Sequence, residues 1–222
     1  MLKNTIEKGL EFFKTIIDFI LPVRSDYEIV RRLDEKSIHA LPKALRVQDN
    51  DWINPLFSYR DKKVKAIIWE LKYRENMLPL GTIGKMFFDE MLVIISDVLL
   101  FDAKAEFVLI PIPLTAKSRS ERGYNQSELV ARAIVENDLQ RTLLYAPQWF
   151  EKTKETPKQS LSQSKIDRTE NLVGCFKADE RIAGKYVFLI DDVVTTGSTL
   201  NEARKTLLDM GAVNVYGFTV AH

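Results

Sequence analysis

Cysteine and histidine are scarce in this chain of 222 residues, which contains one cysteine and two histidines. A single cysteine excludes an internal disulfide and a zinc site built from several cysteines. Two histidines argue against a multi-histidine metal site and against a Ser-His-Asp triad. Cys175 lies in the apolar stretch NLVGCF, so we expect a small buried hydrophobic residue rather than a nucleophile.

The sequence also lacks a marked excess of one charge and a long uncharged apolar run. Its formal net charge of +1 argues against non-specific nucleic-acid binding through overall charge, although local basic clusters stay open. Residues 1–21 have apolar side chains at helical spacing, but charged residues interrupt them between Glu7 and Asp18. We therefore expect a docking helix there, no membrane span or signal peptide, and a cytoplasmic protein. A membrane-surface helix is the less favoured alternative, because the polar face carries mixed charge.

The remaining pattern is typical of a globular α/β protein, with 45% hydrophobic and 28% charged residues. Apolar runs predict strands at 56–59, 107–112, 187–190 and 213–220. Helical periodicity predicts helices after Asp61, over 82–100 and over 126–137. A further helix is expected from the Ser198 region to a stop at Gly211, with Leu200, Ala203, Leu207 and Leu208 facing inward. Residues 1–55 are expected to form a mostly helical cap, and residues 56–222 the main domain, with a parallel sheet as its core.

The most informative segment is YVFLIDDVVTTGSTL at 186–200. A continuous apolar run predicts a buried parallel strand, and Asp191 and Asp192 follow where open α/β sheets bind ligands. Val194 and the small, mostly hydroxylated residues Thr195, Thr196, Gly197, Ser198 and Thr199 come next. Such a loop at a helix start can hold a phosphate, and the two acids can accept hydrogen bonds from sugar hydroxyls or bind a metal.

Two other interpretations of this segment are less favoured. Asp, Ser and Thr also favour N-capped turns, but capping alone does not explain two adjacent acids directly after a buried strand. A Walker-B-like strand end would require a GxxxxGK[ST] loop elsewhere in the chain, and the sequence contains none.

A second segment, PIPLTAKSRSERGYNQSELVAR at 111–132, also begins where a predicted strand ends. Lys117, Arg119 and Arg122 fall in the connection to the next helix. Three cations beside a strand terminus suit a polyphosphate, because charge-assisted and bidentate donors bind it best. A solvated basic turn is the alternative for these residues taken alone.

The 186–200 run resembles the motif with which type I phosphoribosyltransferases bind 5-phosphoribosyl-1-pyrophosphate (PRPP). Together with PIPL, RGYNQ and the TPKQSLS pattern from 156 onward, it resembles the competence protein ComF family over about residues 56–222. The resemblance implies a Rossmann-like type I phosphoribosyltransferase core. Many ComF-like proteins carry an N-terminal cysteine-rich zinc module, whereas this chain has no cysteine before Cys175.

The resemblance also implies roles for the site residues. Asp191 and Asp192 would contact the ribose hydroxyls, and residues 194–199 would hold the 5′-phosphate. Residues 111–122, with Lys117, Arg119 and Arg122, would form the pyrophosphate loop. The polar stretch 153–170 would be the flexible active-site loop, with Lys158, Lys165 and Arg168 reaching over pyrophosphate. Mg²⁺ is the expected cofactor, held by substrate oxygens and at most by Asp191 and Asp192.

Three functions are compatible with the sequence. The favoured one is a Mg²⁺-dependent transferase that moves the phosphoribosyl group from PRPP to an unidentified nitrogen acceptor. The second is a non-catalytic regulator that binds PRPP or a ribose-5-phosphate-containing nucleotide. The third is a protein of DNA uptake that binds single-stranded DNA or an uptake protein partner. A homo-oligomer is expected from the apolar face predicted for residues 1–21.

Overall fold

The computed structural model describes residues 25–47, 50–73, 79–154 and 174–222. The helix expected over 1–21 and almost all of the polar stretch 153–170 lie outside the described residues.

The centre of the described structure is a five-stranded sheet in the order β1-β7-β6-β2-β3, and every neighbouring pair is parallel. Its strands are β1 (Ile53–Phe57), β2 (Phe107–Pro111), β3 (Leu143–Tyr145), β6 (Tyr186–Val193) and β7 (Asn214–Ala221). A separate antiparallel ribbon pairs β4 (Phe150–Lys152) with β5 (Phe176–Ala178). The predicted α/β fold with a parallel, Rossmann-like sheet is confirmed.

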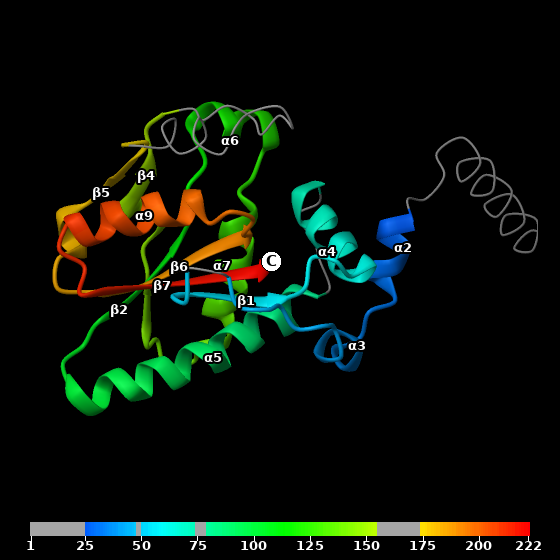
Figure 1. Cartoon of the computed structure of the whole chain (residues 1–222), viewed down its shortest axis with the longest axis horizontal. Helices are drawn as coiled ribbons and strands as arrows, with labels where there is room; N and C mark the ends of the chain where they lie inside the picture. The colour runs from blue at the N-terminus through cyan, green and yellow to red at the C-terminus, as the bar shows by residue number, and fades with distance from the viewer. Residues whose placement is uncertain (1–24, 48–49, 74–78, 155–173) are drawn as a thin grey trace, which may run out of the picture.

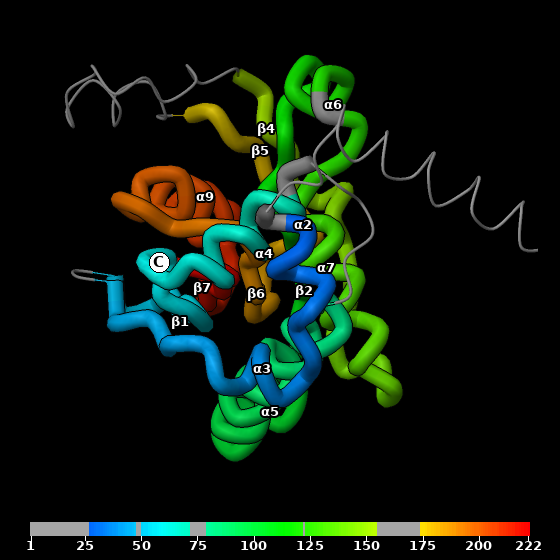
Figure 2. Tube along the Cα trace, turned by 90° about the vertical axis from the view of Figure 1, so that its right-hand side faces the viewer, coloured from blue at the N-terminus to red at the C-terminus, as the bar shows by residue number. Residues whose placement is uncertain are grey.

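Helices cover both faces of this sheet (Figure 1). They are α2 (Ser25–Arg31), α3 (Glu35–His39), α4 (Lys62–Tyr73), α5 (Leu80–Phe101), α6 (Ala116–Arg122), α7 (Gln126–Asn137) and α9 (Ser198–Asp209), with short 3₁₀ turns at Pro147–Trp149 and Glu180–Ile182. Figure 2 looks toward the carboxyl ends of the strands, with α9 on one side of β6 and α7 on the other.

The protein has a hydrophobic core on each face of the sheet, and the side chains of β6 alternate between the two cores. Phe188 and Ile190 belong to the cluster shared with α5 and α7, whereas Val187 and Leu189 belong to the cluster shared with α9. Successive side chains of a strand point to opposite faces, so a strand covered on both sides is apolar throughout. This is why the predicted continuous apolar run is fully buried here.

Several predicted elements agree closely with the structure. The helix expected over 126–137 coincides with α7, and Asp61 caps α4 by accepting hydrogen bonds from the backbone N–H groups of Lys63 (2.7 Å) and Val64 (3.2 Å). The strand expected at 56–59 begins earlier, at Ile53, and includes Pro55. Proline is tolerated there because β1 is an edge strand of the described sheet.

One predicted core position is wrong. Leu208 was expected to face inward, but it is 37% exposed, whereas its neighbour Leu207 is fully buried. Adjacent positions on a helix differ by about 100°, so only one of them can face the sheet directly. No helix among the described residues is both long enough and apolar enough to cross a membrane.

Candidate functional site

The acid pair lies at the carboxyl end of β6, which continues to Val193, two residues beyond Asp191. Asp191 pairs with Thr219 of β7, and Val193 with Ala221. Both carboxylates are half-buried, and each accepts a hydrogen bond from the following backbone N–H: Asp192 N to Asp191 Oδ1 at 2.9 Å, and Val193 N to Asp192 Oδ1 at 2.8 Å. The acids are therefore held by the regular strand backbone rather than by a mobile turn.

The small-residue loop follows at once and leads into α9. Val194 is buried, and its N–H donates to Ala221 O at 3.0 Å. Gly197 has a left-handed backbone (φ 75°), which glycine adopts without steric cost, and α9 begins at Ser198. The hydroxyls of Thr196 and Ser198 lie 2.9 Å apart.

The backbone donors of this loop are the feature that suits a phosphate. Among the described residues, none accepts a hydrogen bond from the backbone N–H of Thr195, Thr196 or Gly197. The 12-residue helix α9 adds the positive end of its dipole at the same point. The loop and the first turn of α9 therefore present several N–H groups and hydroxyls to an anion.

The predicted basic connection is a short helix rather than a loop. Thr115 caps α6 by accepting a hydrogen bond from Ser118 N at 3.1 Å. Lys117 and Arg119 are exposed on this helix, and Arg122 is its last residue. Among the described residues Lys117 has no ion-pair partner.

Strand pairing brings this basic helix to the acid pair. Pro111 at the end of β2 is in register with Ile190 of β6, and Ile112 N donates to Ile190 O at 2.8 Å. The chain that enters α6 therefore starts one residue from Asp191 on the neighbouring strand. The carboxyl end of β6, the start of α9 and the short helix α6 lie at the same end of the sheet (Figures 1 and 2).

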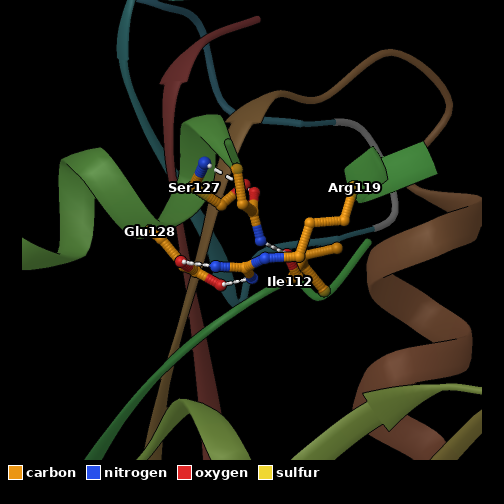
Figure 3. Close-up of polar contacts among 5 residues, drawn as sticks. Ile112, Arg119, Ser127 and Glu128 are labelled. Carbon is orange, nitrogen blue, oxygen red and sulfur yellow. Dashed lines mark hydrogen bonds and ion pairs between the residues drawn. The ribbon is translucent and has the colours of Figure 1, made fainter. Parts of the chain in front are cut away.

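Arg119 is held by Glu128 of α7 in a bidentate ion pair (Figure 3). Nη1 donates to Oε1, and Nη2 donates to Oε2 at 3.0 Å. The hydrogen bonds to Glu128 raise the pKa of the Arg119 guanidinium further above its ordinary value. The Arg119 side chain is 53% exposed and that of Glu128 only 15%, so the carboxylate anchors a cation that still reaches solvent.

The first turn of α7 also contacts Asp191, through Ser127. The sequence analysis did not identify Ser127 as a site residue. Ser127 Oγ donates to Asp191 Oδ1 at 3.0 Å. Asn125 caps the helix by accepting from Ser127 N at 3.1 Å, and its amide donates to Ile112 O at 2.9 Å (Figure 3). An asparagine directly before an apolar helical pattern signals an N-cap, but nothing in the sequence links Ser127 to Asp191.

Asn50 is the other residue that sequence reasoning missed. It is only 8% exposed, and its amide lies against Gly197 in the small-residue loop. Trp52 Nε1 donates to Asn50 Oδ1 at 3.3 Å, and the Trp52 ring stacks under the Arg204 guanidinium of α9, 4.9 Å away. The segment before β1 thus supports the loop from the side of the edge strand.

The acid pair fits a magnesium ion only in company with a substrate. No group of three His, Cys, Asp or Glu side chains that could hold a metal occurs within residues 25–47, 50–73, 79–154 and 174–222. Mg²⁺ needs only one or two protein carboxylates when phosphate oxygens and waters complete its octahedron. Asp191 and Asp192 suffice for that arrangement. Lys158, Lys165 and Arg168 lie outside the described residues.

Comparison with known proteins gives the family context. No protein-family model matches the chain. It is 33% identical over 115 residues to the competence protein ComFC of Bacillus subtilis (51% of this chain, 44% of that protein). It is 32% identical over 111 residues to the DNA utilization protein YhgH of Escherichia coli K12 (48% and 45%), and 31% identical over 127 residues to the competence protein F of Haemophilus influenzae (51% and 50%).

The chain therefore spans about half the length of the curated relatives that it matches. These relatives are named for competence and for DNA utilization. They bear out the resemblance predicted from the sequence motifs: over about half of its length, this chain is a homologue of the ComF family.

Proposed function

We propose that this protein binds PRPP, or a nucleotide that carries ribose 5-phosphate, and transfers the phosphoribosyl group to a nitrogen acceptor. The observation that carries the proposal is the arrangement at one sheet edge. The acid pair ends β6 and is followed by a loop with three backbone N–H groups that no described residue accepts, and a basic helix follows the neighbouring strand β2. These three elements match the three chemical parts of PRPP: a diol, a monophosphate and a pyrophosphate.

In the proposed complex the loop 195–199 holds the 5′-phosphate through its backbone N–H groups and hydroxyls. Asp191 and Asp192 accept hydrogen bonds from the ribose 2′- and 3′-hydroxyls. With the phosphate and the hydroxyls held in this way, the pyrophosphate on C1′ would face the cations of α6, which follows the neighbouring strand β2. Orientation of this kind lowers the barrier by prepaying the entropy of alignment.

The cations of α6 would act on the leaving group. In the transfer, the bond from C1′ to the pyrophosphate oxygen breaks and a bond from the acceptor nitrogen to C1′ forms. The proton of that nitrogen passes to solvent, and pyrophosphate departs. Lys117, Arg119 and Arg122 offset the charge that develops on the departing oxygens. A bound Mg²⁺ would supply further charge neutralisation at the pyrophosphate, with Asp191 and Asp192 as its protein ligands.

Calorimetric titration with PRPP, with and without Mg²⁺, tests this proposal. We expect wild-type protein to bind PRPP more tightly with Mg²⁺, and Asp191→Ala/Asp192→Ala to lose binding. A matched control, Asp89→Ala/Asp97→Ala, removes two exposed carboxylates from α5 and should bind as the wild type does. Absence of PRPP binding to the wild type would reject the proposal.

A screen of amines and bases for pyrophosphate release separates a transferase from a non-catalytic regulator. An enzyme releases pyrophosphate only with its acceptor present, and Asp191→Ala/Asp192→Ala stops the release. A regulator binds PRPP with the same dependence on the acid pair but releases none with any acceptor.

A role in the uptake or use of DNA is the second candidate, and the names of the homologues favour it. In that case the loop and the α6 cations would bind the phosphates of single-stranded DNA or a partner protein. Binding of a fluorescent oligonucleotide that weakens steeply with salt, falls on Lys117→Ala and ignores Asp191→Ala/Asp192→Ala would support it. Binding of PRPP that depends on the acids would support the transferase site.

A further inference from the structure

Two consecutive residues of α7 contact both halves of the candidate site. Ser127 is buried, and its hydroxyl donates to Asp191 Oδ1 at 3.0 Å across 64 residues of sequence. The next residue, Glu128, binds both Nη atoms of Arg119 on α6. Figure 3 shows both side chains leaving the same helical turn, with the guanidinium of Arg119 against Glu128.

The turn that carries them is firmly anchored. Asn125 connects it to the carbonyl of Ile112 at the end of β2 by a 2.9 Å hydrogen bond. Further along α7, Val130, Ala131 and Ile134 are fully buried in the core between this helix, α5 and the sheet. A helix packed in this way moves little relative to the strands, because interiors are close-packed.

Without these contacts the side chains of Arg119 and Asp191 would sample more conformations. Arg119 is half exposed, and a solvated arginine samples many rotamers whose loss opposes ligand binding. Asp191 can rotate about its terminal torsion, which is broad and roughly two-fold in carboxylates. The hydroxyl of Ser127 and the N–H of Asp192 both donate to Oδ1, and they select one orientation of the carboxylate.

We propose that Ser127 and Glu128 are positioning residues that set the spacing between the acid pair and the pyrophosphate-binding cation. This inference rests on the proposed function of the same edge. Neither residue needs to touch the substrate. Each acts through one partner, Ser127 through Asp191 and Glu128 through Arg119, and the rigid first turn of α7 links the two partners.

The serine half is tested with two probes, PRPP with Mg²⁺ and inorganic phosphate. In the proposed site, inorganic phosphate contacts only the loop 195–199, whereas PRPP contacts the loop and the acid pair. We expect Ser127→Ala to weaken PRPP binding about tenfold, the effect typical of one lost hydrogen bond to a charged group. Phosphate binding, followed by NMR titration, should stay unchanged. In the Asp191→Ala background, Ser127→Ala should have no further effect on PRPP affinity.

The glutamate half is tested with inorganic pyrophosphate in a double-mutant cycle with Arg119→Ala. Removing a carboxylate beside an anion site favours the anion by simple charge, so a weaker affinity can arise only through Arg119. We expect Glu128→Ala to weaken pyrophosphate binding about fivefold in the wild-type background, because the freed arginine must be ordered again. With Arg119→Ala present, the same change should leave binding unaltered or slightly tighter. Glu128→Gln, which keeps one acceptor oxygen, should fall between.

The outcomes separate this inference from the proposed function. If the wild type binds no PRPP, the proposed function fails. If it binds PRPP through the acid pair but Ser127→Ala binds as tightly as the wild type, the positioning role of Ser127 is rejected. Equal losses for PRPP and phosphate would mean a merely structural serine, and also reject it. Tighter pyrophosphate binding by Glu128→Ala would show that Glu128 acts as a repulsive charge and reject its positioning role.

Discussion

The amide of Asn50 lies directly against Gly197, so that a Cβ built on this glycine would be 3.3 Å from Asn50 Nδ2 and 3.5 Å from Asn201 Nδ2. Two side-chain amides thus lie close to the position that a side chain on the left-handed Gly197 would occupy. The left-handed backbone favours glycine at this position, and a side chain there would crowd the amide of Asn50.

Gly197→Ala is therefore expected to disturb the loop and abolish most phosphate and PRPP binding. The variant has to place alanine at φ 75°, which costs about 1–2 kcal/mol of stability, and its Cβ crowds Asn50. Thermal unfolding and phosphate titration measure the two effects.

Gly184→Ala is the matched control for this variant. Gly184 has φ 76° and no atom within 4 Å of a built Cβ, and it lies before the amino end of β6, at the far end of that strand from the acid pair. It should lose similar stability and keep full binding. If both variants bound phosphate as the wild type does, the loop would not be the phosphate site.

Close packing of α5 on α7 predicts a sharp contrast between two glycines of α5. A Cβ at Gly84 would lie 2.4 Å from the Ala133 carbonyl oxygen, so Gly84→Ala forces the helices apart at a cost of about 1–3 kcal/mol or more. Gly81 has open space around its Cβ position, so Gly81→Ala should stabilise the protein by about 0.5 kcal/mol. Chemical denaturation of both variants checks the signs, and a neutral Gly84→Ala would contradict the packing.

The single cysteine is expected to be inert in the folded protein. Cys175 is fully buried, and burial raises the pKa of its thiol, which lowers the fraction of reactive thiolate at neutral pH. A thiol reagent at pH 8 should label native protein far more slowly than protein in denaturant. Equal rates in the two states would show that the β5 region opens readily.

Asp179 is expected to stay ionised in acid. The hydrogen bonds from the Arg181 guanidinium, and then from Arg181 N, lower the pKa of this carboxyl to about 2. Because the folded pKa lies below the unfolded value of about 3.9, the stabilisation is complete above that value and is lost as the pH falls through about 2. Carboxyl NMR shifts should show little titration of Asp179 down to pH 3.

Asp179→Asn tests the same link through stability. The difference in unfolding free energy between this variant and the wild type should be small, since the pair is exposed, and constant from pH 7 to 5. It should shrink progressively below pH 4. A difference that grew in acid would contradict the lowered pKa.

The sequence was sufficient for those parts of the fold whose signals are local. Asp61 at the start of α4 and the apolar spacing of α7 are contained within a few residues, and both elements were predicted correctly. The pattern failed where packing decides, as at Leu208, which is adjacent to the inward-facing Leu207. Residues 116–122 have no apolar periodicity, so the short helix α6 gave no signal.

The same distinction holds for the site. Asp191, Asp192 and the following loop are contiguous, so their common position could be predicted from the sequence. The hydrogen bond from Ser127 to Asp191 joins residues 64 apart in the sequence. Asn50 and Gly197, which lie in contact, are even farther apart along the chain. Such partners follow only from how α7 packs on the sheet and from where β1 joins it.

The position of β7 inside the sheet has a consequence for synthesis on the ribosome. β7 lies between β1 and β6, so a nascent chain that has not yet reached Asn214 cannot join those two strands. Until then the backbone of β6 that carries Asp191 is an open edge, and Val194 has no Ala221 carbonyl to accept its N–H. The candidate site is thus completed only after β7 has been synthesised, and premature termination before β7 would leave an exposed strand prone to pairing with other chains.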